Sequence, residues 1–213
     1  MENKPQIKAD LFNDTEEMTS SEITTIKEES LAIKQSKDEV KLLMFLNKKP
    51  EPKYIKQHPT VTVKIKTPDG EKYVPSKYVP ITYVRTILDA IYPNYSYEIK
   101  ESKLVANSIQ TTVRLYLTDW NGNQFFRDGV GAQKIQVDKG SSPIDMSKIK
   151  SDAIQMAAPS SASYAFKNAC ESLGNLFGRG LNSDIDYMVA NNEDLKEMVN
   201  KKYDNLFKDD ANV

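Results

Sequence analysis

Few residues in this chain could do chemistry. Its 213 residues include one histidine, His58, and one cysteine, Cys170. A zinc site needs about four such ligands, and any nucleophile–histidine pair would have to use His58, which stands in a charged connector. The Gly-x-x-x-x-Gly-Lys-Ser/Thr motif that cradles nucleotide phosphates is missing. The sequence therefore predicts a binding protein that is not an enzyme, with no catalytic residues, no metal and no cofactor.

Two weaker patterns leave this prediction unchanged. Gly129-Val130-Gly131 lacks the third glycine and the helix start of a dinucleotide-binding fingerprint, so it indicates a turn or a bulge. Asp128, Asp138 and Asp145 could in principle bind Mg²⁺, but nothing in their spacing favours a magnesium site.

The positive charge of the chain is concentrated in its middle. Residues 1–40 carry a net charge of −5, residues 41–181 one of +8 and residues 182–213 one of −4. The middle block holds all four arginines, Arg85, Arg114, Arg127 and Arg179. A basic block between acidic ends is typical of a domain that binds a polyanion and has solvated tails. Charge alone leaves an ordinary solvated surface as an equal alternative.

The composition also indicates the setting of the protein. A single cysteine excludes an internal disulfide and favours a reducing, cytoplasmic environment. The first residues are polar and acidic, without the apolar core of a signal peptide. No run of about 18 apolar residues is present. We therefore expect an intracellular protein that does not contact a membrane.

Sequence periodicity predicts an α+β fold with antiparallel strands. Turn signals at Asp69-Gly70 and at residues 119–123 predict two hairpins. The expected strands are 60–66, 72–74, 95–101, 108–118 and 124–129, with Lys64, Lys66 and Lys72 on one polar surface, Val113, Leu115 and Leu117 in the core, and Arg114 on the opposite sheet face. The expected helices are 21–34, 36–46 with Ser36 as cap, 81–92 with Thr82 as cap, 148–157 with Ser147 as cap, 160–181 and 192–207.

The helix expected at 160–181 is the element around which the fold should be organised. Pro159 and Ser160 indicate its start. Cys170, Gly174 and Gly178 are spaced four apart and would form a ridge of small side chains. Such a ridge favours close packing against a sheet, and the alternative is a backbone that nucleic acid can approach.

Several stretches, in their order along the chain, resemble the Rad52-type single-strand annealing proteins, especially the phage-encoded members. Residues 165–178, Ala-Phe-Lys-Asn-Ala-Cys-Glu-Ser-Leu-Gly-Asn-Leu-Phe-Gly, are similar to the family's Ala-Leu-Lys-Arg-Ala-x-x-x-Phe-Gly-Asn-x-Leu-Gly helix. Residues 113–131, which end in Phe-Arg-Asp-Gly-Val-Gly, resemble the hairpin before its acidic-glycine turn. Residues 52–55, Pro-Lys-Tyr-Ile, and 81–83, Ile-Thr-Tyr, followed by a helix and Tyr-Ser-Tyr at 95–97, resemble the start of its domain. The resemblance covers about residues 45–185.

This resemblance implies a fold and a function. The fold would be an antiparallel sheet packed against a long helix, a β-β-β-α kernel, assembled into a homo-oligomeric ring or helical filament. A basic groove would hold single-stranded DNA by its backbone with the bases exposed, so that complementary strands can anneal without ATP during recombination and repair of phage genomes. Phosphate contacts are independent of sequence, and annealing needs free base edges.

The resemblance also implies which residues contact DNA. Lys167 matches the lysine of the family's DNA-binding helix, whereas Asn168 and Glu171 stand where further basic residues are usual. Lys148 and Lys150 lie in the segment that resembles an outer basic strip, and Lys134 and Lys139 flank the loop before it. These four lysines, with Lys167 and Arg127, are the expected phosphate contacts, and Lys56 and His58 are expected on the groove floor.

Three regions follow from these patterns. They are an acidic, partly disordered segment (1–36), an annealing domain that binds single-stranded DNA (37–185), and an acidic helix and tail (186–213). The tail either docks a host or phage replication or recombination protein or weakens non-specific DNA binding. A non-annealing module that coats DNA or recruits partners remains the alternative function.

Overall fold

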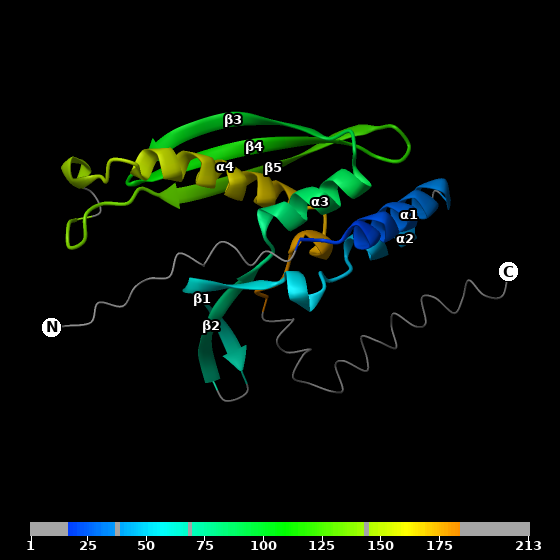
Figure 1. The fold of residues 1–213 in the computed structure, drawn as a ribbon, viewed down its shortest axis with the longest axis horizontal. Helices are drawn as coiled ribbons and strands as arrows, with labels where there is room; N and C mark the ends of the chain where they lie inside the picture. Colours follow the sequence, from blue (N-terminus) through cyan, green and yellow to red (C-terminus); the bar gives the residue numbers. More distant parts are fainter. Residues whose placement is uncertain (1–16, 37–38, 68–69, 143–144, 184–213) are drawn as a thin grey trace. The chain divides into compact units, whose positions relative to one another are not determined.

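The computed structural model describes residues 17–36, 39–67, 70–142 and 145–183 (Figure 1). They fall into two compact units, which are described separately. Of the described residues, those up to Ile55 and from Val79 to Arg179 form the first unit, and those from Lys56 to Tyr78 and from 180 to 183 belong to the second. Residues 1–16 and the helix expected at 192–207 lie outside the described residues.

The first unit is built on an antiparallel sheet in the order β3-β4-β5. The strands are β3 Ser96–Val105, β4 Ser108–Thr118 and β5 Gln124–Lys134, so the last strand is five residues longer than expected. Asp119 organises the turn between β4 and β5, because its carboxylate accepts hydrogen bonds from the backbone N–H groups of Asn121 (2.9 Å) and Asn123 (2.7 Å). The α+β class and the antiparallel sheets are confirmed.

The core lies between this sheet and the helix α4, Ala153–Glu171 (Figure 1). Val113, Leu115 and Leu117 are at most 2% exposed, which confirms them as core residues. They alternate with outward-facing residues along β4, as the period of a strand requires. A buried hydroxyl pair joins the two layers, because Thr111 Oγ1 of β4 lies 2.7 Å from Ser161 Oγ of α4.

Two glycines of β5 allow α4 to approach the sheet closely. A Cβ atom on Gly129 would stand 2.1 Å from the carbonyl oxygen of Ala165, and one on Gly131 would stand 2.3 Å from the backbone nitrogen of Ala165. The contact is therefore backbone against backbone. Gly129-Val130-Gly131, which the sequence predicted to be a turn or a bulge, is instead part of the regular strand β5, which packs under α4.

The prediction of two helices separated at Pro159 was wrong, since α4 runs through this proline without a break. Proline removes one hydrogen bond from a helix interior at a cost of about 3 kcal/mol. Packing of a continuous face, including Ala157 and Ala165, on the sheet compensates for this loss. Ser160 is not a cap, because its hydroxyl donates to the carbonyl of Met156 inside the helix (2.8 Å).

The predicted ridge of small residues was also wrong, because α4 ends at Glu171. Gly174 and Gly178 lie beyond it, flanking the 3-10 turn η4, Asn175–Phe177, and Gly178 has a φ of 98° that favours glycine. Gly174 does serve close packing, although against another element. A Cβ there would stand 2.3 Å from the carbonyl oxygen of Leu46, at the end of α2.

The remaining helices of this unit are α1 Ser20–Ser36, α2 Glu39–Leu46 and α3 Ile81–Ile91. The helix expected at 81–92 is confirmed, and it buries one apolar face that includes Val84, Ile87, Leu88 and Ile91. Three predicted caps were wrong. Thr82 lies inside α3, Ser36 is the last residue of α1, and Ser147 belongs to the 3-10 turn η3, Met146–Lys148, which Asp145 caps.

The start of α1 is a capping box. The Glu22 carboxylate accepts from the Thr19 backbone N–H (2.7 Å), and the Thr19 hydroxyl accepts from the Glu22 N–H (3.3 Å). Glu22 also pairs with Lys53 and accepts from the Tyr54 hydroxyl (2.7 Å), both on or beside the 3-10 turn η2, Pro52–Tyr54. One carboxylate thus joins the first helix to a segment about thirty residues later.

The stability of this junction should depend on pH. The hydrogen bond from Lys53, followed by those from Thr19, lowers the pKa of Glu22 from 4.5 to about 2. Because the folded pKa is depressed, the stabilisation is present above pH 4.5 and is lost as the pH falls toward 2. We expect hydrogen-exchange protection of α1 to fall across this window relative to β4. The Glu22→Gln variant should lose that pH dependence, and an unchanged profile would refute the assignment.

The second unit contains a hairpin of β1 Lys56–Thr67 and β2 Gly70–Tyr78. Its two strands agree with the sequence prediction, each with more residues than expected, and residue 69 of the predicted turn lies outside the described residues. The predicted lysine surface shared by the two strands is wrong, because Lys72 stands opposite Ile65 and therefore on the other face from Lys64. Lys64 forms an ion pair with Glu71.

Candidate nucleic-acid interface

The segment that leads from β5 to α4, residues 134–150, carries several of the predicted DNA contacts and is here called the lysine loop. A short antiparallel bridge, Val137 opposite Ile149, brings its two ends together. The bridge is held by backbone hydrogen bonds from Asp138 N–H to the Lys148 carbonyl (2.9 Å) and from Lys150 N–H to the Gln136 carbonyl (3.1 Å). The loop therefore has a fixed base.

Apolar contacts fix this base to the core. Ile135 is 1% exposed and packs with Ala153 and Ala157 of α4, and Ile149 packs against the same cluster. Asp145 orders the return segment, because its carboxylate accepts from both the N–H (3.1 Å) and the hydroxyl (2.6 Å) of Ser147. The lysine side chains consequently project from an anchored backbone.

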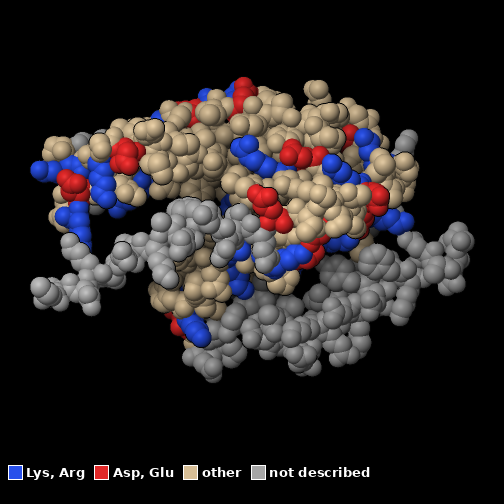
Figure 2. All heavy atoms as spheres, in the orientation of Figure 1, with Lys and Arg blue, Asp and Glu red and all other residues tan. Residues whose placement is uncertain are grey.

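Four of the eight predicted DNA contacts, Lys134, Lys139, Lys148 and Lys150, lie on the lysine loop, and all four are exposed. In the part of the chain that the structure describes, none of these four forms an ion pair. Asp138, Asp145 and Asp152 lie in or beside the same segment, so the lysines exceed the carboxylates by one. Figure 2 shows basic side chains, with interspersed acidic ones, gathering at the end of the first unit where α4 begins.

Lys167 does not belong to this group. Its side chain is 13% exposed and lies 3.8 Å from the Glu171 carboxylate, one turn further along α4. Burial lowers the pKa of Lys167 and raises that of Glu171. The lysine that the family resemblance assigns to DNA is therefore largely covered and partly neutralised by its neighbour.

Asn168 likewise has a structural role. Its side-chain amide donates to the carbonyl of Val130 on β5 (2.7 Å), so it ties the helix to the edge of the sheet. The two residues that depart from the family pattern thus have local structural roles. Glu171 is the ion-pair partner of Lys167, and Asn168 contacts the edge of the sheet.

Arg127 is exposed but lies apart from the lysine loop. It stands opposite Leu115, on the helix side of the sheet, whereas Lys134 stands opposite Ser108 on the other face. Seven residues of strand, about 23 Å, separate the two along β5. The guanidinium group of Arg127 lies 5.1 Å from the ring centroid of Phe125 and donates to the Phe126 carbonyl (3.0 Å).

Lys56 and His58 belong to β1, in the second unit. His58 stands in an irregular part of the hairpin, between Gln57 and Thr62, where the register shifts. Its Nδ1 accepts a hydrogen bond from the Val61 N–H (3.0 Å), and its ring lies 6.1 Å from that of Tyr78. His58 therefore stabilises a local bulge.

Sequence reasoning missed one cation–aromatic cluster in the first unit. The exposed Arg85 of α3 places its guanidinium 5.1 Å from the ring centroid of Phe166 in α4, and Tyr97 of β3 meets the same ring edge-on at 5.0 Å. No spacing rule links these three residues, because they come from separate elements.

A second missed interaction could have been found. Arg114 forms a bidentate pair with Asp128, with both N–O distances at 2.7 Å. Counting outward from the turn at residues 119–123 places these two residues opposite each other, as they are observed. Their pairing keeps Arg114 occupied on the outer sheet face, as the alternation predicted.

Other kinds of site find little support among the described residues. Within them no three histidine, cysteine, aspartate or glutamate side chains gather as a metal site would need. Cys170 is buried, which raises the pKa of its thiol to about 12. No helix in the described ranges is long and apolar enough to cross a membrane.

Comparison with known proteins adds no assignment. No protein-family model matches the chain. No curated protein matches it either.

Proposed function

We propose that this protein binds single-stranded DNA and anneals complementary strands without ATP, in homologous recombination or repair. The observation that carries the proposal is the lysine loop, with its four exposed lysines on an anchored backbone. Such a surface attracts phosphates regardless of base sequence. The contacts would be Lys134, Lys139, Lys148 and Lys150, with Arg127, Lys56 and His58 contributing from elsewhere and Lys167 the least.

The composition of the lysine loop favours annealing over tight coating. Residues 134–150 contain no aromatic side chain. Proteins that sequester single strands commonly stack the bases on aromatic rings, at about 1–3 kcal/mol per base. A strand held here by phosphate contacts alone would keep its base edges available to a complementary strand.

The order of elements supports the Rad52-like part of the proposal. Three antiparallel strands are followed by one long helix that lies on them, which is the order expected of a β-β-β-α kernel. A ring or helical filament of subunits, in the cytoplasm of a bacterial phage host, is part of the same proposal. So is a replication or recombination partner bound by the acidic tail.

A second candidate is a module that coats or recruits without annealing. The observation that favours it is the burial of Lys167 beside Glu171, because it leaves the central helix less basic than the annealing family would have it. This candidate predicts binding of single strands with no change in their rate of pairing.

Annealing of two complementary dye-labelled oligonucleotides, without ATP and across a salt series, separates these functions. Acceleration that fades as salt rises is the expected result, because the binding is electrostatic. Tight binding without acceleration would favour the coating module. Absence of binding at low salt would refute both.

A further inference from the structure

The two edges of the β3-β4-β5 sheet differ. At the β5 edge, the Asn168 side chain of α4 occupies the carbonyl of Val130 (2.7 Å). At the β3 edge, no strand pairs within the described ranges, and all ten residues of Ser96–Val105 are exposed. An open edge of this length presents a row of backbone donors and acceptors to another chain.

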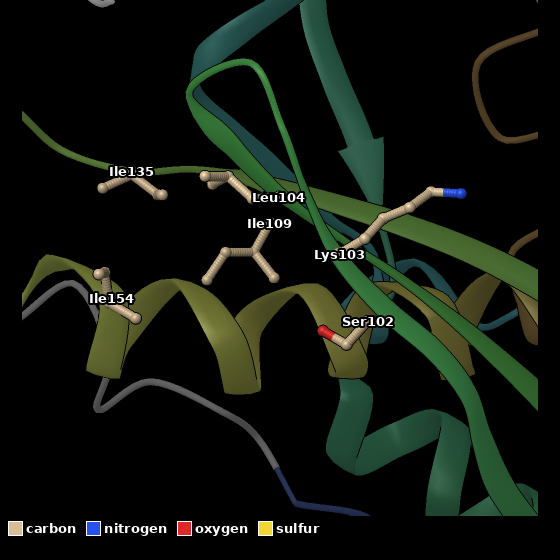
Figure 3. A pocket seen from close by; sticks show the side chains of 6 residues that line it. All are labelled: Ser102, Lys103, Leu104, Ile109, Ile135 and Ile154. Atoms are coloured by element: carbon tan, nitrogen blue, oxygen red, sulfur yellow. The ribbon is translucent and has the colours of Figure 1, made fainter. Parts of the chain in front are cut away.

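The helix-facing side of β3 is largely apolar and only partly covered. Tyr97, Ile99 and Leu104 are 46%, 55% and 56% exposed, respectively. Beside Leu104 lies a hollow of about 300 Å³, closed on the helix side by Ile154 of α4 (Figure 3). Its other lining residues are Ser102, Lys103, Ile109 and Ile135. A partner strand added at β3 would cover this apolar side.

A bulge divides β3 into two halves. Ile99 pairs with Val113 and Glu101 with Thr112, so Lys100 has no partner in β4. Residues 97 and 99, before the bulge, and residues 102 and 104, after it, therefore face α4. On the opposite side the charges alternate in sign, with Lys100 3.2 Å from Glu98 and Lys103 2.8 Å from Glu101.

We propose that β3 pairs antiparallel with β3 of a second copy of this chain, about a two-fold axis, in the register that places Glu98 opposite Lys103. The same register sets Lys100 opposite Glu101 and Tyr97 opposite Leu104, and each of these pairs occurs twice. Every pair outside the bulge then joins residues on the same face, as an antiparallel ladder requires. Tyr97 of the partner subunit stands beside Leu104, at the rim of the hollow.

Charge selects this register over its neighbours. A slip of two residues one way places Lys100 opposite Lys103, and a slip the other way places Glu98 opposite Glu101. Like charges directly opposite each other destabilise a strand pair. The sequence of β3 is thus complementary to itself in a single register among these three.

The difference between the β3 and β5 edges of the sheet also favours a two-fold contact over a head-to-tail one. Head-to-tail addition of β3 to β5 of the next copy would have to displace Asn168 from Val130. A two-fold contact avoids this and closes at two copies, with one continuous six-stranded sheet. A ring or filament would need another surface, so the inference stands whether or not the protein anneals DNA.

Register-specific cross-linking tests the proposal on the full chain. Ile99→Cys and Ser102→Cys variants are purified separately, mixed and oxidised, and we expect a disulfide-linked dimer from the mixture. Either variant alone should remain unlinked, because three residues of strand, about 10 Å, separate the two equivalent cysteines. The native Cys170 is fully buried and should not interfere. No mixed disulfide, or equal linking within each variant alone, would overturn the proposal.

Charge exchange in the same assay adds a second test. Adding Glu98→Lys to both cysteine variants should lower the yield of mixed disulfide about fivefold, because two like-charged pairs arise. Glu98→Lys on one variant and Lys103→Glu on the other should restore it, since both pairs become opposite in sign. Glu28→Lys, the same charge change at an exposed position of α1, serves as the control. A yield unaffected by Glu98→Lys, or not restored by the exchange, would contradict the register.

Discussion

Replacing both Lys148 and Lys150 by glutamate should weaken binding of single-stranded DNA about tenfold at low salt, and by a similar factor for every sequence. Both lysines are exposed on the lysine loop and have no carboxylate partner among the residues that the structure describes. A lysine that contacts a phosphate releases a counterion, so its loss reduces the dependence of affinity on salt. The slope of log K against log salt should fall by about 1.4 for two contacts on a single strand.

Fluorescence anisotropy with mixed-sequence oligonucleotides at several salt concentrations measures both quantities. Lys27→Glu with Lys34→Glu is the matched control, because it makes the same change in net charge on the exposed face of α1. The control should leave the slope unchanged. A loss of affinity confined to some sequences would indicate contacts with bases. An equal loss in the control would mean that net charge, and no defined surface, drives the binding.

The sheet could be predicted from the sequence because its signals are local. Alternation along residues 108–118 identified Val113, Leu115 and Leu117 as core, and they are buried. The turn at residues 119–123 fixes the register of β4 and β5, and with it the pair between Arg114 and Asp128. These features depend on a few neighbouring residues, so no knowledge of the remaining chain was needed.

The central helix could not be predicted in the same way. Pro159 is a strong local signal for a helix boundary, yet α4 continues through it, because the face that includes Ala157, Ser161 and Ala165 packs on the sheet. The glycines that matter for this packing are in the strand, at Gly129 and Gly131, and the helix has none. Either the helix or the strand can supply the small residues at a close contact, and the choice depends on the distance between the two backbones. The spacing of residues along the sequence carries no information about that distance.

Some features of the candidate site could likewise be predicted from the sequence, and others could not. The bridge between Val137 and Ile149 joins the two ends of the segment that carries the lysines at 134, 139, 148 and 150, and this pairing is too short to leave a sequence pattern. The resemblance that singled out Lys167 concerns residue types, whereas its 13% exposure depends on how α4 lies on the sheet. Positions along one segment were thus predictable, but burial on a packed helix was not.

The largest effect on stability should come from Gly129→Ala. The added methyl group would stand 2.1 Å from the carbonyl oxygen of Ala165 and 2.3 Å from the backbone nitrogen of Ala169. Overpacking usually costs about 1–3 kcal/mol, and here the obstructing atoms are helix backbone that no rotamer change can move. We expect the free energy of unfolding to fall by about 3 kcal/mol or more, and the melting temperature by about 6–12 °C.

Two further variants make this prediction specific to the backbone contact. Val130→Ala changes the next residue of β5, which faces away from α4 and is 49% exposed, so it should cost no more than about 1 kcal/mol. Adding Ala169→Gly to Gly129→Ala should not restore stability, because that change removes a side chain and leaves the obstructing backbone in place. Thermal melts followed by circular dichroism measure all three. Rescue by Ala169→Gly would show that α4 packs on β5 through side chains, with enough space between the backbones for a methyl group at Gly129.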